Sequence, residues 1–198
     1  MNSVGSASMS GDTAQVATDG VGNLRFTVGG AGDNVFRNTT VSAPNQTSGI
    51  YELSFTYTSA TFTGGDATGA NVGFGIRDDS NTDLFVVRIQ KQNDVIRLQH
   101  RVGNTNTDLE NFGVTTLANL AVRVEFDLDA DTFSVFWTPD GGIEKSAIGL
   151  PLAAPDLELD MIRLLANTNN TDWGATDEVT VDFLRLAARP RRLDILRF

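Results

Sequence analysis

The sequence predicts an all-β protein, built as a sandwich or a barrel. Apolar and polar residues alternate with a period of two through many short segments, as they do in strands with one buried face. Turn signals rich in glycine, asparagine and aspartate separate these segments every ~8–12 residues. The 198 residues include nineteen glycines and twelve phenylalanines, which agrees with a turn-rich β architecture. No segment has a convincing helical period.

The clearest unit is a hairpin over residues 120–142. Apolar residues alternate with charged ones from Val122 to Leu128, which predicts a strand. An acidic turn over 129–131 follows, and the alternation restarts from Phe133 to Trp137. A Pro-Asp-Gly-Gly turn ends the unit. The apolar face of the hairpin, Trp137 included, is expected to lie in the core.

Further strands are expected on both sides of this hairpin. The segment 143–150 is an edge strand or a connector, and 103–110 and 168–177 are polar loops. The other predicted strands cover residues 24–28, 34–41, 49–58, 70–77, 84–90, 95–101, 160–167 and 178–186.

Three of these strands carry arginine and glutamine on the face opposite their apolar residues. If the strands are neighbours, these side chains form a basic stripe that can hold an acidic glycan. The alternative is ordinary cross-strand pairing with nearby acidic residues. Gly73 and Gly75 lie on the same outer face and permit close approach by a ligand or another backbone. The candidate ligand-binding residues on this stripe are Arg77, Arg88, Gln90, Arg97, Gln99 and Arg101.

Trp173, in the loop 168–177, is a further candidate ligand-binding residue. Aromatic rings stack on the apolar faces of sugars. The alternative is that this ring folds back onto the edge of the sandwich, and the sequence does not choose between the two.

Composition and charge limit the classes of function. The chain has no cysteine and a formal net charge of −10, so it has no disulfide framework, and nucleic acid is not an expected partner. No stretch is long and apolar enough to span a membrane, and no signal peptide is visible at the start. We expect a flexible leader over 1–20, a sandwich over 21–187 and a separate tail over 188–198.

The tail differs from the acidic body because it is basic and ends in apolar residues. Such a segment suits docking to a protein complex or to an anionic membrane surface, whereas the alternative is a final strand folded on its own domain. The candidate docking residues are Arg189, Arg191, Arg192, Leu193, Leu196 and Phe198.

Three segments, in this order, resemble those of concanavalin A-like jelly rolls. The strand 49–55 (GIYELSF) resembles their G-x-Y-E-V strand, 122–142 resembles their Y-x-V-x-I-E-F-D … V-x-V-W-x-D-G hairpin, and 178–186 resembles their closing V-D-Y-V-R-V strand. Laminin-G-like domains and family-16 glycoside hydrolases share this pattern. The resemblance implies a two-sheet antiparallel jelly-roll sandwich with a ligand-facing sheet.

The same resemblance implies a structural calcium site. In this sequence, Asp182 on the last strand would meet the backbone carbonyl of Gly49 and a carbonyl near Leu24. The alternative is that Asp182 faces water or caps a neighbouring turn.

Catalytic motifs of the family are missing. Family-16 hydrolases carry Glu-x-Asp-x-Glu on an inner strand, whereas the superficially similar run that starts at Glu125 ends in Asp129 and lies on a different strand. Jelly-roll lyases need a tyrosine or histidine beside arginine or glutamine, but His100, Tyr51 and Tyr57 share faces with core residues.

The resulting expectation is a non-catalytic, extracytoplasmic (secreted or periplasmic) binding module, with a glycan as ligand by resemblance. The first alternative is a structural subunit of a larger, membrane-associated assembly, attached through the tail. The second alternative is a polysaccharide lyase or hydrolase.

Overall fold

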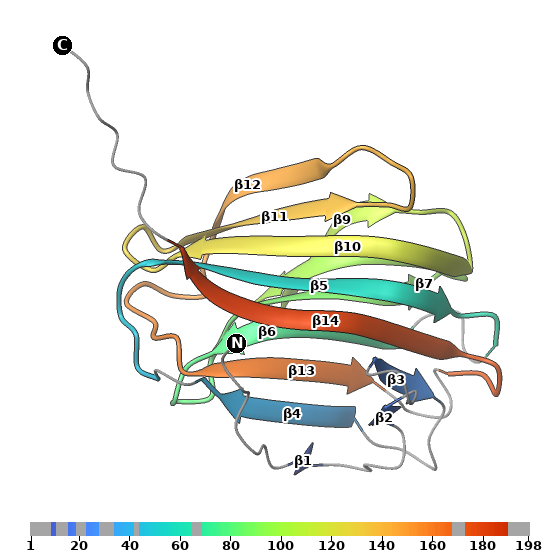
Figure 1. Cartoon of the computed structure of the whole chain (residues 1–198), viewed down its shortest axis with the longest axis horizontal. Coiled ribbons are helices and arrows are strands. Elements are labelled where there is room, and N and C mark those ends of the chain that lie inside the picture. Colours follow the sequence, from blue (N-terminus) through green and yellow to red (C-terminus); the bar gives the residue numbers. More distant parts are fainter. Residues whose placement is uncertain are drawn as a thin grey trace.

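The alternating segments form strands that pair into two antiparallel sheets, labelled A and B here. The computed structural model describes residues 9–10, 16–18, 23–27, 34–41, 44–64, 69–167 and 173–189, and these contain fourteen strands and no helix. Figure 1 shows the two layers, with β10, β5 and β14 lying in front of the fainter β6 and β7. The predicted all-β, two-sheet jelly-roll sandwich is confirmed.

Sheet A has seven strands in the order β1-β4-β13-β6-β7-β8-β9. Their bounds are β1 Met9–Ser10, β4 Asn34–Thr40, β13 Met161–Asn167, β6 Asn71–Arg77, β7 Asp83–Gln92, β8 Val95–Val102 and β9 Thr105–Asn111.

Sheet B has seven strands in the order β12-β11-β10-β5-β14-β3-β2. Their bounds are β12 Lys145–Pro151, β11 Thr132–Thr138, β10 Thr116–Asp127, β5 Ile50–Thr61, β14 Glu178–Arg189, β3 Leu24–Thr27 and β2 Val16–Thr18.

The predicted hairpin is the pair β10–β11. Val122 lies opposite Trp137, and Phe126 lies opposite Phe133. All four side chains are at most 5% exposed, so the alternation identified the buried face of both strands correctly.

Aromatic side chains join the two sheets across the core. Phe85 of β7 stacks on Phe133 of β11 with ring centroids 4.9 Å apart, and it also contacts Phe126 of β10. Phe55 of β5 packs against Phe74 of β6 at 4.7 Å. Rings from one sheet that fill gaps in the other fix how the two layers lie on each other.

Three segments differ most from the expectation. The predicted loop 103–110 contains β9, a polar edge strand that pairs with β8. The segment 1–20, expected as a flexible leader, contains β1, which pairs with β4, and β2, which pairs with β3. Strand β14 continues to Arg189 instead of ending at residue 186. Strands with little apolar content are held by backbone pairing to a neighbouring strand. This pairing leaves no apolar alternation in the sequence, so these strands were missed.

The described part of the chain has no helix that is both long and apolar enough to cross a membrane.

Candidate anion-binding site

The arginine-bearing strands are neighbours, as the stripe hypothesis required. Strands β6, β7, β8 and β9 follow one another in sheet A. Register places Gly73, Arg88 and Gln99 side by side in one row, with Asp108 next on β9. Because side chains in one row point to the same side of a sheet, this row lies on the outer face, opposite the core.

Arg88 is the centre of this face. Its side chain is only 7% exposed. Its Nη2 donates to Gln90 Oε1 at 2.6 Å, and its Nε and Nη2 both donate to Gln99 Oε1 at 3.3 Å. No described carboxylate pairs with it, and its Nη1 has no described acceptor. Arg88 is therefore a buried cation whose charge is met by neutral oxygens alone.

Burial, together with the neighbouring charge of Arg101, lowers the pKa of Arg88 to about 10, and the electrostatic interaction with Tyr57 opposes this in part. The group still carries its proton at neutral pH. Desolvating a cation without an anionic partner is costly, so an incoming carboxylate or sulfate would be stabilised at this position.

Gln99 links Arg88 to an ion pair at the edge of the face. Its amide donates to Asp108 Oδ1 at 2.7 Å and to Gln92 Oε1 at 3.2 Å, which directs its carbonyl oxygen toward Arg88. Asp108 also pairs with Arg97. Burial raises the pKa of Asp108, but hydrogen bonds from Gln99 and Arg97 and the Arg97 charge outweigh burial and lower it.

Two glycines keep the neighbouring strand close to Arg88. A Cβ atom on Gly73 would lie 2.4 Å from Arg88 Cβ, and one on Gly75 would lie 2.1 Å from the carbonyl oxygen of Phe85. Both contacts are closer than real atoms allow. The outer-face glycines predicted to permit a close approach therefore accommodate strand β7.

Arg77 belongs to a separate ion cluster on the same sheet. Arg77 Nε lies 3.1 Å from Asp83 Oδ1, and Arg163 Nη1 donates to both Asp83 oxygens at 2.6 and 2.5 Å. Burial, then repulsion by Arg163, lowers the pKa of Arg77, and attraction by Asp83 and Asp78 opposes this. Arg77 is thus already paired with a carboxylate.

The charge of this face is opposite to that of the chain. Arg101 donates to the carbonyl oxygen of Gly103 at 2.9 Å and pairs with no described carboxylate. Among the side chains that the structure describes, this face gathers five arginines and two aspartates, a net charge of +3, whereas the whole chain carries −10. The charged residues of the face are Arg77, Arg88, Arg97, Arg101, Arg163, Asp83 and Asp108.

Three members of this network, Asp83, Arg163 and Asp108, were not singled out from the sequence. The strand 160–167 was predicted, and its alternation of Ile162 and Leu164 with Arg163 contained the signal that places Arg163 on the outer face. Asp108 lay in a segment assigned to a loop, so no face was assigned to it.

Trp173 does not lie on this face. It is 1% exposed and packs edge-on against Phe62 with ring centroids 5.4 Å apart. The ring belongs to the core, so its interpretation as a sugar-stacking platform is wrong. The alternative, in which this ring folds back onto the sandwich, is correct.

The three residues expected to hold calcium are not brought together. Asp182 is exposed and lies opposite Thr56, whereas Gly49 immediately precedes Ile50 at the far end of β5. Seven residues of strand separate the two positions, about 23 Å. The Gly49 carbonyl accepts from the Leu128 N–H. Leu24 lies near Asp182 through its pairing with Val181, but this set does not fit a calcium ion.

One of the residues proposed for docking through the C-terminal tail, Arg189, belongs to the sandwich instead. Arg189 is the last residue of β14 and pairs with Glu52 at 2.5 Å and with Glu125 at 3.1 Å, so it is part of sheet B. The remaining docking candidates lie outside the described residues, and docking through them stays a prediction; they are Arg191, Arg192, Leu193, Leu196 and Phe198.

The groups considered for catalysis lie away from the arginine face. Tyr57 is fully buried and donates to the Val72 carbonyl at 2.8 Å. Tyr51 stacks on Phe126. His100 is 8% exposed and contacts Phe133 edge-on, and burial lowers its pKa. Each of these rings contacts the core, as their shared faces predicted.

The fold is similar to that of several solved structures. Lectin II from Ulex europaeus matches with a TM-score of 0.60 and 10% identity, over 96% of this chain and 95% of that one. A legume lectin-like domain from Entamoeba histolytica matches with a TM-score of 0.60 and 10% identity, over 93% of this chain and 90% of that one. The alginate lyase from Klebsiella pneumoniae matches with a TM-score of 0.59 and 11% identity, over 89% of this chain and 85% of that one.

The concanavalin A-like fold inferred from the sequence is thus confirmed. No family model and no curated protein matches the sequence.

Proposed function

We propose that this protein is a non-catalytic, extracytoplasmic glycan-binding module whose ligand is an acidic polysaccharide bound on the outer face of sheet A. The observation that carries the proposal is Arg88, a buried guanidinium held by two glutamines with no carboxylate partner among the described residues. The similarity to legume lectin-like structures supports carbohydrate binding at the level of the fold.

The proposed role of each residue follows from its contacts. Arg88 and Arg101 receive the carboxylate or sulfate of the ligand, because both lack a described anionic partner and a guanidinium fork matches a planar carboxylate. Gln90 and Gln99 hold the Arg88 side chain in place. Arg97 and Asp108 fix the orientation of Gln99.

A polysaccharide lyase is the second candidate function. The similarity to an alginate lyase favours it, as does a face with arginine and glutamine side by side, which suits neutralisation of a uronate. The chemistry also needs a proton acceptor within reach of the sugar. Of the described tyrosines and the one histidine, none lies on this face, so binding without cleavage is the preferred proposal. Formation of unsaturated ends, followed by ultraviolet absorbance, would favour the lyase.

Affinity electrophoresis tests the proposal. The full chain is run through gels that contain alginate, polygalacturonate or hyaluronan, and retardation by at least one of them is expected. Arg88→Gln and Arg101→Gln should each abolish or strongly reduce this retardation. Arg101 is partly exposed, so its substitution does not disturb the buried network. Arg185→Gln is the matched control, because it removes the same charge from an exposed position on sheet B.

Two results would contradict the proposal. One is migration that none of the three polyanions changes. The other is equal retardation of the wild type and both sheet A variants, which would assign any binding to another surface.

A further inference from the structure

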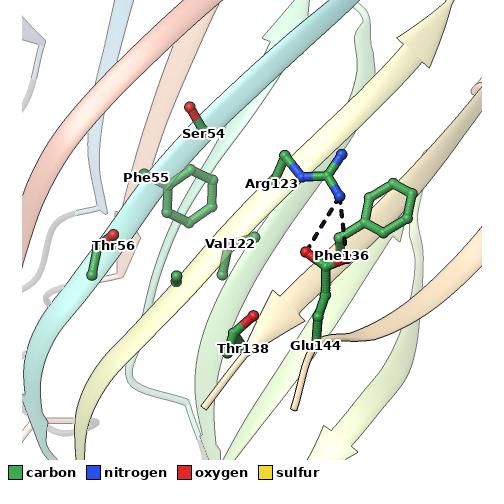
Figure 2. A pocket seen from close by; sticks show the side chains of 9 residues that line it. Ser54, Phe55, Thr56, Val122, Arg123, Phe136, Thr138 and Glu144 are labelled. Atoms are coloured by element: carbon green, nitrogen blue, oxygen red, sulfur yellow. Dashed lines mark hydrogen bonds and ion pairs between the residues drawn. The ribbon is translucent and has the colours of Figure 1, made fainter. Parts of the chain in front are cut away.

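A shallow depression lies on the outer face of sheet B, the opposite side of the molecule from the arginine face. Figure 2 shows Ser54 and Thr56 of β5, Arg123 of β10, and Phe136 and Thr138 of β11 around it, with Glu144 at its rim. Its volume is about 240 Å³. It is separate from the site of the proposed function, so this inference does not rest on that proposal.

Strand register explains why the depression forms. Thr56, Ala121 and Thr138 lie side by side in one row across β5, β10 and β11. Ser54, Arg123 and Phe136 form the next row. The small side chain of Ala121, at the centre of the first row, leaves a gap that Arg123 and Phe136 of the second row border.

Arg123 is a fixed wall of this depression. Its guanidinium carbon lies 3.9 Å from the centroid of the Phe136 ring. It also pairs with Glu125, and its Nη2 donates to the two Glu144 oxygens at 3.4 and 3.3 Å. An arginine held by a ring and two carboxylates loses little conformational freedom when a ligand binds.

Three hydroxyl groups also line the depression. Among the described residues, Ser54, Thr56 and Thr138 make no side-chain hydrogen bond. Each hydroxyl can both donate and accept. The two charged residues that line the depression, Arg123 and Glu144, pair with each other, so its lining offers no unpaired charge to an ionic ligand.

We propose that this depression binds one ring of a neutral sugar. Hydroxyl groups that donate and accept in turn, together with the methyl group of Ala121, match a polyhydroxylated ring with apolar C–H patches. The volume is below the ~300 Å³ at which pockets for drug-sized ligands begin, which agrees with a single ring. The two faces of the sandwich thereby take glycans of different charge.

The test is a titration of the ¹⁵N-labelled full chain with cellohexaose, maltohexaose and mannohexaose. At least one of these neutral oligosaccharides should shift the amide resonances of Thr56, Ala121 and Thr138. Ala121→Tyr fills the gap and should weaken this binding at least about tenfold, the equivalent of one or two hydrogen bonds. Thr138→Val removes one hydroxyl at constant shape and should weaken it less.

Ala118→Tyr is the matched control, because Ala118 is also an exposed alanine of β10 and does not line the depression. It should bind like the wild type, and Arg88→Gln should do the same. Three results would overturn the inference: no shift at these amides with any of the three sugars, unchanged binding by Ala121→Tyr, or shifts confined to sheet A.

Discussion

At the scale of single residues, the proposed glycan binding depends most on Arg88. Its pKa is lowered to about 10, yet it stays charged at neutral pH, so the protein keeps a desolvated cation on a sheet face. The sequence placed this side chain on the correct face, because Val87 and Ile89 alternate with it. It could not reveal how deeply Arg88 is buried, since that depends on neighbouring strands.

His100 gives a prediction for pH. Burial lowers its pKa below 6.5, so the unfolded chain takes up this proton at a higher pH than the folded chain does. The stability that His100 contributes is present above about pH 6.5 and is lost as the pH falls through the folded pKa. His100→Gln removes this dependence. The free energy of unfolding is measured with urea at about pH 7.5 and at about pH 5.5. From the higher to the lower pH, the wild type should lose more of this free energy than the variant does. An equal difference between the two proteins at both pH values would refute the prediction.

At the scale of elements, the strands were predictable wherever one face is apolar. Strand β5 alternates Leu53, Phe55 and Tyr57 with polar residues, so its position and its buried face followed from the sequence. Strand β9 reads as a loop, because most of its side chains are exposed and polar. Trp173 was ambiguous for a related reason, since a loop residue has no alternation that assigns it to a face.

The carboxylate of Asp177 joins the segment that precedes β14 to the segment that follows β5. Asp177 is 2% exposed and accepts from the N–H groups of Thr63 and Gly64 at 2.8 and 2.9 Å and of Gly174 at 3.0 Å. Asp177→Ala would leave three N–H groups without their acceptor, and we expect a loss of about 3 kcal/mol in the free energy of unfolding.

Urea denaturation measures this loss. Asp177→Asn keeps one acceptor oxygen and should recover part of it. Asp140→Ala, at an exposed turn position, should change the free energy of unfolding by less than ~0.5 kcal/mol. Equal stability of the Asp177→Ala and Asp140→Ala variants would show that the three hydrogen bonds do not hold these segments together.

At the scale of the whole molecule, the two sheets present different chemistry. The described side chains on the outer face of sheet A carry +3 on a chain of −10, so an acidic ligand is attracted to one side and repelled elsewhere. The sequence predicted both the sandwich and the arginine stripe. It could not predict the register of β14 on β5. Asp182 of β14 lies opposite Thr56, far from Gly49, which precedes β5, although the two were expected to share a calcium ion.

The central claim, that the face of Arg88 recognises the charge of a glycan, is tested most directly by calorimetric titration with one oligosaccharide in two forms. The first form is an oligouronate that the protein binds in affinity gels, and the second is the same oligomer after its carboxylates are reduced to alcohols. The account predicts that the wild type binds the acid form only, that added salt weakens this binding, and that Arg88→Gln abolishes it. Equal affinity of the wild type for the two forms would contradict the account.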